Sequence, residues 1–497
     1  MSLTGLPREL RDAIYIYYVT EEDGYHYDLS SGKLRTSTNE RIDTLSLMHV
    51  CKGIASEMRG VHFVNNTVHF STTPLPTDRG SSRARHHGYL LEDLYTAKRL
   101  VLPWVRQYIS NDIAQRVIDR FPKSEALLRH LMSTKRRICQ GFEQLGKSGD
   151  WGQAPSFHRD TIDELLNLVA QTPAVGELTR KVLERQGFRF RHEQNVASLY
   201  QLHPIAWRLP NKQESKIVED QSPIGPHNPW RERVRDRTRY YISAASQAAD
   251  FLSKLQQQHR VHIRSVDLHE THAAISYPEC HARALIPFAI ENPKLKIIRY
   301  ADLWGGVLTS LQSARFEEHR SDPGQGVGPM RTMYAWELTK TIAPWLMEAM
   351  ALHPAGMPAK CFTLVFKGEP ELMQPILDIV IEDAAWQDAL QTKSDRQEQP
   401  PVPDRSGTGY KRHSCYQFEG FPGLMRDVIA GNGSIQFNNC SAQGWDIEEL
   451  FEANPGCSDT ADWNEAWQSM RLQAVVPPAP QTWDAILSDY VQEKDDA

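Results

Sequence analysis

The chain has 497 residues, more than a single hydrophobic core ordinarily serves, so its length favours about two to four domains. Hydrophobic residues make up 40% of the sequence and charged residues 24%, as in soluble globular proteins. The formal net charge of -6 excludes a surface built as a whole to bind nucleic-acid phosphates, so nucleic acid is not an expected partner.

The N-terminal residues and the cysteines indicate an intracellular protein. Residues 1–5 lead directly into a polar helix start, without the basic and apolar regions of a secretory signal. No apolar run approaches the roughly 20 residues that cross a bilayer, so we expect no contact with a membrane. The seven cysteines are scattered without a C-x-x-C pair, which is typical of reduced thiols. We therefore expect the protein in the cytoplasm or the nucleus.

The first part of the chain predicts a short helix with one apolar face. Pro7 suits the first turn of a helix, where its missing N–H is not needed. Apolar residues then recur at steps of three and four, namely Leu6, Leu10, Ile14 and Tyr17. The polar stretch 21–40 predicts a hairpin or a loop.

A second helix is predicted over 47–58, and the β-prone runs 61–64 and 67–70 predict short strands. Residues 1–70 are thus expected to form one small helical unit closed by a strand. Two helices of this length bury little surface, so their apolar faces need a cover. That cover is either the rest of the chain or another protein.

These residues resemble a known domain. The pattern L-P-x-E-L-x-x-x-I-Y, a spacer, then S-L-x-x-V-C-x-x-I-x-x-E and a closing strand is similar to the F-box-like N-terminal domain of large families of filamentous-fungal proteins. The spacer is longer than in a compact F-box, and an aromatic residue usual after V-C is missing. The resemblance implies a face that docks a Skp-type adaptor of a cullin-RING ubiquitin ligase. By position, this face consists of Leu6, Pro7, Leu10, Ile14, Val50, Cys51 and Ile54.

Helical spacing dominates the middle of the chain. Residues 71–88 contain several Pro, Gly and Ser residues and predict a linker. Apolar residues at helical steps then predict a helical middle segment over 89–209. The proline-containing polar stretch 210–229 predicts a second linker.

The part from 230 to 390 predicts an α/β body. A helix over 240–255 leads into the hexamer 263–268, whose apolar spacing recurs at 295–300 and 361–366. Strands that alternate with helix-length crossovers predict a parallel layer. The hexamers resemble leucine-rich repeats, although their separation is irregular and the asparagine ladder of such repeats is missing.

The last part of the chain is less regular. Residues 391–412 hold three prolines among charged residues and predict a loop or a third linker. Residues 413–497 predict a C-terminal α+β segment that ends in an acidic tail.

Four residues around the first hexamer are weak candidates for metal ligands, namely His269, His272, Cys280 and His281. Imidazole and thiolate groups are good zinc donors. However, the first two histidines are three residues apart at a strand end, not four apart on a helix as in a metalloprotease. The sequence therefore predicts neither a metal nor a cofactor.

Motifs for enzyme chemistry are weak. The G-x-G-x-G run at 324–328 lies between prolines, without the strand-to-helix turn that binds phosphate. The sequence contains no G-x-S-x-G nucleophile elbow. We therefore expect a protein that is not an enzyme, with an enzyme or metal-binding protein in the His269/His272/His281 region as a further alternative.

The sequence as a whole predicts an α+β multidomain protein with an F-box-like helical head, a helical middle segment and an α/β body of irregular leucine-rich-repeat-like strand units. The preferred function is protein–protein interaction, in which the head docks a Skp-type adaptor and the body binds an unknown protein. The alternative is a non-catalytic scaffold with the head buried against the body. The exposure of Leu10, Ile14 and Val50 distinguishes these two hypotheses.

Overall fold

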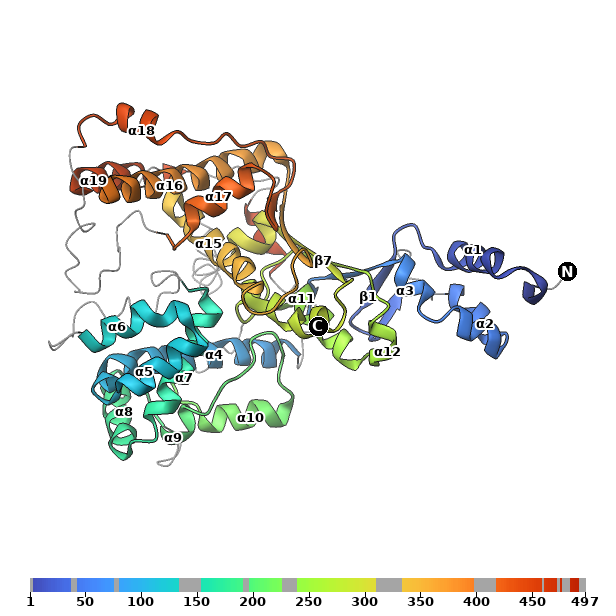
Figure 1. Cartoon of the computed structure of the whole chain (residues 1–497). Coiled ribbons are helices and arrows are strands. Elements are labelled where there is room, and N and C mark those ends of the chain that lie inside the picture. The colour runs from blue at the N-terminus through green and yellow to red at the C-terminus, as the bar shows by residue number, and fades with distance from the viewer. Residues whose placement is uncertain are drawn as a thin grey trace.

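Figure 1 shows a computed structural model of the chain. It describes residues 3–36, 43–75, 80–133, 153–190, 196–225, 239–309, 333–396, 417–457, 460–471, 474–475 and 483–490. Many helices combine with one seven-stranded sheet, which confirms a mixture of α and β structure. Two lobes lie side by side, and a narrow head with α1, α2 and α3 projects from the end of the sheet (Figure 1).

The large sheet is built from strands that come from the whole length of the chain. In spatial order its strands are β10 (Ile435–Phe437), β9 (Phe362–Lys367), β7 (Lys296–Asp302), β6 (Ser265–Glu270), β3 (Thr67–Ser71), β1 (Tyr25–Asp28) and β2 (Lys33–Arg35). All neighbouring pairs are parallel except the antiparallel β1–β2 hairpin. Since β6, β7 and β9 overlap the three hexamers, the predicted parallel layer is confirmed.

The two faces of this sheet differ. Along β6, Val266 and Leu268 are buried, whereas Asp267 and His269 between and after them are only half-buried. Helices that follow the strands complete the core on the buried face: α11 (Ala244–Lys254), α13 (Ile286–Glu291), α15 (Ala335–Leu352), α16 (Pro370–Arg396) and α17 (Phe421–Ile429). The opposite face, with Asp267 and His269, is called the open face below.

A buried ion pair joins the sheet to the helices. Glu270 at the end of β6 accepts hydrogen bonds from the Arg299 guanidinium of β7, with Nη2 at 2.8 Å and Nε at 3.0 Å. Glu270 also accepts the backbone N–H groups of Ala244 and Ala245 in the first turn of α11 and the hydroxyl of Thr72. One carboxylate thus connects two strands, a helix N-terminus and the residue after β3.

The middle segment forms a lobe with a separate hydrophobic core. Its helices are α4 (Gly80–Val105), α5 (Asn111–Arg120), α6 (Glu125–Ser133), α7 (Pro155–Val169), α8 (Pro173–Arg185), α9 (Val196–Leu199) and α10 (Lys212–Gln221). None of the helices that the structure describes combines the length and the apolar character needed to span a bilayer.

Both linkers predicted around this lobe need correction. Helix α4 begins at Gly80, within the predicted linker 71–88. Helix α10 occupies half of the predicted linker 210–229, because Asn211 and Glu214 form a capping box at its start. Local capping therefore outweighs the prolines and polar residues that suggested a linker.

The C-terminal part packs on the long helix α16. Its elements are α18 (Ile447–Ala453), α19 (Thr460–Arg471), β11 (Ala474–Val475) and α20 (Trp483–Ser488), and β11 pairs with β8 (Met333–Tyr334). Trp463 and Trp467 of α19 are buried against Trp386 of α16. Of the predicted loop 391–412, the first six residues continue α16, and 397–412 lie outside the described residues, as do the glycine run 324–328 and the acidic tail.

The helix α1 (Arg8–Val19) in the head confirms the predicted first helix. The β1–β2 hairpin confirms the hairpin predicted in the polar stretch 21–40. The predicted helix 47–58 is instead divided into the 3-10 helix η2 (Asp43–His49) and α2 (Lys52–Glu57). The break lies at Cys51, whose extended backbone makes it the N-cap of α2, with its Sγ accepting the N–H of Ile54.

The end of the head differs more from the prediction. The β-prone run 61–64 is part of a helix, α3 (Val61–Asn65), which buries Phe63 in the main core. Strand β3 pairs with β6, and its Val68 and Phe70 belong to the same core. Residues 1–70 are therefore not a separate unit, because the predicted boundary at residue 70 cuts through the central sheet.

A buried carboxylate connects the helical lobe to the body and predicts a pH effect. Ser156 of α7 donates its backbone N–H and its hydroxyl to Glu348 of α15, at 2.6 and 2.7 Å. Burial raises the pKa of Glu348 to about 7, although Arg159 opposes this. Because an unfolded glutamate has a pKa of about 4.3, the folded state holds this proton more tightly, and stability is lost as the pH rises from about 4 to about 7.

We expect Glu348→Gln, which does not ionise, to lack this loss. Between pH 5 and pH 8, the free energy of unfolding of the wild type should fall relative to that of the variant by about 2–3 kcal/mol. Urea denaturation at both pH values measures the difference. Glu371→Gln at an exposed site of α16 is the control. Parallel pH profiles for Glu348→Gln and the wild type would contradict the assignment.

Candidate functional site

Helix α1 has two apolar faces with different surroundings. Tyr15 and Val19 are buried in a small core that the head forms for itself. Leu10, Ile14 and Tyr17 follow one another at steps of four and three residues and lie on the opposite face. Their exposed fractions are 52%, 39% and 89%. The helix therefore presents an apolar stripe that the described residues leave exposed.

Charged groups hold α1 in this orientation. Glu57 at the end of α2 accepts hydrogen bonds from Arg11, with Nη2 at 2.6 Å, and from the Tyr15 hydroxyl at 2.8 Å. Arg8 lies 3.0 Å from the same carboxylate. The hydrogen bonds from Arg11 and Tyr15 lower the pKa of Glu57 to about 2. Because these contacts fix one side of α1 against α2, the stripe points outward.

The structure brings most of the predicted docking residues to the surface. Leu6 is half-buried, and five others are exposed, namely Pro7, Leu10, Ile14, Val50 and Cys51. Ile54 is only 4% exposed, because α2 turns it into the core of the head, so it is not available for docking. Tyr17 was not among the predicted docking residues but continues the stripe. The exposed apolar residues Leu10, Ile14, Tyr17 and Val50 are called the head surface below.

A row of ring side chains crosses the open face of the sheet. His26 of β1 stacks on His69 of β3, with ring centroids 4.8 Å apart. His269 of β6 stacks on Tyr300 of β7 at 5.1 Å, and the Lys367 ammonium of β9 lies 4.4 Å from the centre of the Tyr300 ring. Alternation in each strand places these side chains away from the core. The row contains several groups that can bind a metal or a proton.

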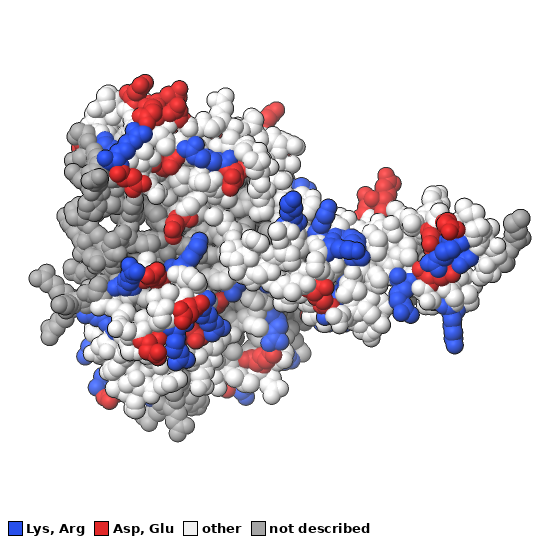
Figure 2. All heavy atoms as spheres, in the orientation of Figure 1, with Lys and Arg blue, Asp and Glu red and all other residues white. Residues whose placement is uncertain are grey.

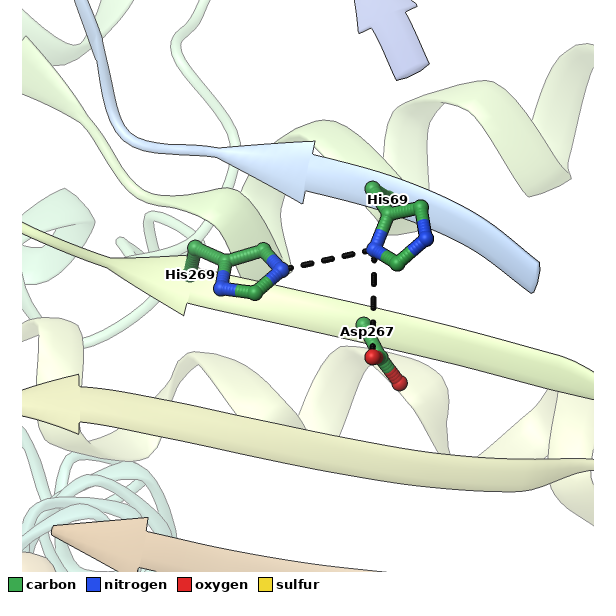
Figure 3. Close-up of side chains that lie close together, drawn as sticks. All are labelled: His69, Asp267 and His269. Carbon is green, nitrogen blue, oxygen red and sulfur yellow. Dashed lines mark hydrogen bonds and ion pairs between the residues drawn. The ribbon is translucent and has the colours of Figure 1, made fainter. Parts of the chain in front are cut away.

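His69, Asp267 and His269 lie close together in this row (Figure 3). His69 Nδ1 is 3.4 Å from His269 Nε2 and 3.8 Å from Asp267 Oδ2. One potential ligand atom from each residue lies within 4.8 Å of the others. Two imidazoles and a carboxylate at this separation are a possible metal-binding set.

The surroundings keep both imidazoles neutral at pH 7. Burial lowers the pKa of His69, and it lowers the pKa of His269 to about 4, with smaller contributions from His69 and Lys367. Burial also raises the pKa of Asp267, although Lys367 opposes this. Neutral imidazole is the form that binds a metal ion.

The weak metal candidates from the sequence do not come together. His272 stacks on Tyr241 with ring centroids 4.3 Å apart. His281 is buried between the Ser243 hydroxyl and the Ser276 carbonyl, each at 2.7 Å. Of the four candidates, His269 alone is in the cluster of Figure 3.

Cys280 is the fourth of these candidates and is also away from the cluster. It is buried, and Arg159 lies 3.7 Å from its sulfur. Burial raises the pKa of the Cys280 thiol, which keeps it protonated. A protonated thiol is a poor metal ligand, so Cys280 is a packed core residue.

Sequence reasoning missed His69 and Asp267. Alternation with Val68 and Phe70 could have placed His69 opposite the core, and alternation in β6 could have done the same for Asp267. However, His69 and His269 are 200 residues apart in the chain. Their proximity depends on the pairing of β3 with β6, which no local pattern specifies.

Comparisons of the chain with protein-family models, with curated proteins and with solved structures give no match.

Proposed function

We propose that the protein is an interaction subunit that docks a Skp-type adaptor through its head surface, as a substrate-recruiting subunit of a cullin-RING ubiquitin ligase. The observation that carries this proposal is the exposure of Leu10, Ile14 and Tyr17 on a helix that projects from the body (Figure 1). An apolar stripe at the tip of a projecting element is accessible to a partner without any rearrangement of the body. Contiguous exposed apolar side chains are typical of protein-binding surfaces.

The spacing of the stripe supports docking by a helix face. Residues at positions i, i+4 and i+7 form the row of anchors with which an amphipathic helix binds an apolar groove. Full burial of a Leu or Ile side chain contributes about 1.5–3 kcal/mol, so two or three anchors supply a useful part of a binding free energy.

The body supports the second half of the proposal, which is the binding of another protein. Its parallel strands follow one another in chain order from β1 to β10, the order expected of leucine-rich-repeat-like units, and one face of the sheet is open. On the face drawn in Figure 2, basic and acidic side chains are interspersed over both lobes. Mixed charge suits a protein partner better than a nucleic acid.

A binding assay with a purified Skp-type adaptor tests the docking half. We expect the wild type to bind, and Leu10→Asp to weaken binding at least about tenfold, because a carboxylate would be desolvated in an apolar contact. The matched control is Ile217→Asp on α10, where the replaced side chain is 48% exposed and remote from the head. Absence of wild-type binding, or equal binding by Leu10→Asp, would overturn the proposal.

A second candidate function is a non-catalytic scaffold in which the head is part of the body. The pairing of β3 with β6 favours it, since this strand of the head lies inside the central sheet. Helix α1 does not favour it, because its outer face is exposed and not covered by the body. The two candidates therefore predict opposite results for Leu10→Asp in the binding assay.

A further inference from the structure

We propose that His69, Asp267 and His269 bind one divalent transition metal ion, Zn²⁺ in the first place, on the open face of the sheet. This site does not depend on the head surface, and neither proposal needs the other to be correct. It would take its ligands from two neighbouring strands, and each ligand is placed by the register of the sheet.

The parallel register explains why three ligands converge. His69 of β3 lies directly opposite Asp267 of β6, and His269 is two residues further along β6 on the same face. Neighbouring strands are about 4.8 Å apart, so side chains that leave the same face from paired positions reach a common point. No loop is needed to assemble the set, which makes it as rigid as the sheet.

Two of the three separations between ligand atoms are close to those of tetrahedral coordination. Zn–N and Zn–O bonds of about 2.0–2.1 Å place tetrahedral ligand atoms about 3.3 Å apart. The distances from His69 Nδ1 to His269 Nε2 and to Asp267 Oδ2 are 3.4 and 3.8 Å. Octahedral ligands would have to be closer, about 3.0 Å apart, because adjacent bonds then meet at right angles. The third separation, between His269 and Asp267, is within 4.8 Å, so rotation of these two side chains has to bring all three atoms to one zinc ion.

The turn before β1 lies close to the second nitrogen of His69. Gly24 has a φ of +65°, and a Cβ there would lie 2.4 Å from the Thr67 carbonyl oxygen and 3.2 Å from His69 Nε2. Glycine thus lets the turn approach Nε2, which leaves Nδ1 to face the cluster. Metal-binding histidines commonly bond a backbone carbonyl through their other nitrogen.

Asp267 provides an independent indication of a missing partner. Its Oδ1 is buried and has no hydrogen-bond partner among the residues that the structure describes. Most buried polar atoms in folded proteins do have a partner, and a carboxylate is costly to bury without one. A cation bound to Asp267 would compensate the buried charge.

The remaining charges near the site permit a cation. Lys367 opposes a cation, but this side chain is exposed and its ammonium group lies over the Tyr300 ring. Asp267 supplies the negative charge, and the His269 ring is held in place by its stack on Tyr300. Three protein ligands leave a fourth position for water or for a group from outside, as in zinc sites that are not purely structural.

Zinc titration of the metal-free full-length protein by calorimetry tests the proposal. We expect one equivalent of Zn²⁺ to bind the wild type and to raise its melting temperature. His69→Ala and His269→Ala should each weaken binding at least about 100-fold, since even the loss of a supporting residue weakens metal sites by about 10- to 100-fold. His272→Ala is the matched control, because this histidine is nearby but outside the cluster.

Cobalt spectra of the wild type provide a second measurement that does not depend on the folding of a variant. Co²⁺ at this site should give the intense visible bands of tetrahedral coordination, and added Zn²⁺ should remove them. His69→Asn and His269→Gln replace the alanine variants if those do not fold. Lack of Zn²⁺ binding by the wild type, octahedral Co²⁺ spectra, or unchanged affinity in the folded His69 and His269 variants would each overturn the proposal.

Discussion

Glu270→Gln is expected to lower the free energy of unfolding by about 3–5 kcal/mol, because it leaves the buried guanidinium of Arg299 without a countercharge. Both side chains are at most 2% exposed. Burial by itself raises the pKa of Glu270, but Arg299 and the N–H groups of Ala244 and Ala245 outweigh it, so the pKa is lowered and the carboxylate is charged at pH 7. Among the described residues, the other groups that touch Arg299 are the uncharged carbonyls of residues 278 and 279 and the ring of Trp345. The Glu279 carboxyl interacts with Arg299 without a hydrogen bond or an ion pair, and burial raises its pKa.

Urea denaturation of Glu270→Gln at pH 7 measures this effect. The double variant Glu270→Gln/Arg299→Met is the informative control, since it removes both charges and should regain part of the lost stability. The ion pair would not hold the sheet and α11 together as described if the single variant were as stable as the wild type. The same would follow if the double variant lost more free energy of unfolding than the two single variants lose together.

Phe70→Ala is expected to lower the free energy of unfolding by about 3–5 kcal/mol, as for other large-to-small changes in a core. Phe70 is fully buried in the main core, where its ring lies 5.2 Å from that of Tyr27 and 5.7 Å from that of Phe251. Leu10→Ala removes an apolar side chain from the other part of the head, where it is largely exposed. We expect its effect to stay within about 0.5 kcal/mol.

The comparison of these two variants separates the two halves of the head. Thermal or chemical denaturation of both proteins is sufficient, because each change removes apolar atoms without adding charge. A large loss for Leu10→Ala would show that α1 is covered in solution and would favour the scaffold. A small loss for Phe70→Ala would show that β3 does not belong to the main core.

Local sequence patterns determined several elements correctly. The recurrence of Leu10 and Ile14 located α1, the polar stretch after it became the β1–β2 hairpin, and the spacing in the three hexamers located β6, β7 and β9. These patterns succeed because helix and strand periodicity is a property of neighbouring residues. These patterns fail where an N-cap residue starts a helix. Cys51 starts α2 within a predicted helix, and Asn211 caps α10 inside a predicted linker.

Local sequence patterns did not predict which distant strands pair in the sheet. Nothing near Thr67 indicates that this strand pairs with Ser265, because the helical lobe and both predicted linkers lie between them in the chain. For the same reason the sequence assigned His269 to a group with His272 and His281, whereas the sheet places it beside His69. The spacing of residues along the chain therefore does not predict which side chains the sheet brings together.

The sequence by itself thus determined the helical character of the middle segment, the strands β6, β7 and β9 and the amphipathic first helix, since each depends on residues a few positions apart. Only the tertiary structure decided that β3 lies in the central sheet while the outer face of α1 stays exposed, and that His69, Asp267 and His269 meet. The meeting of these side chains follows from the register of β3 and β6, which is set by the burial of Val68 and Phe70 with Val266 and Leu268 in one core. The outer face of α1 is exposed because Arg11 and Tyr15 hold the other side of the helix to Glu57.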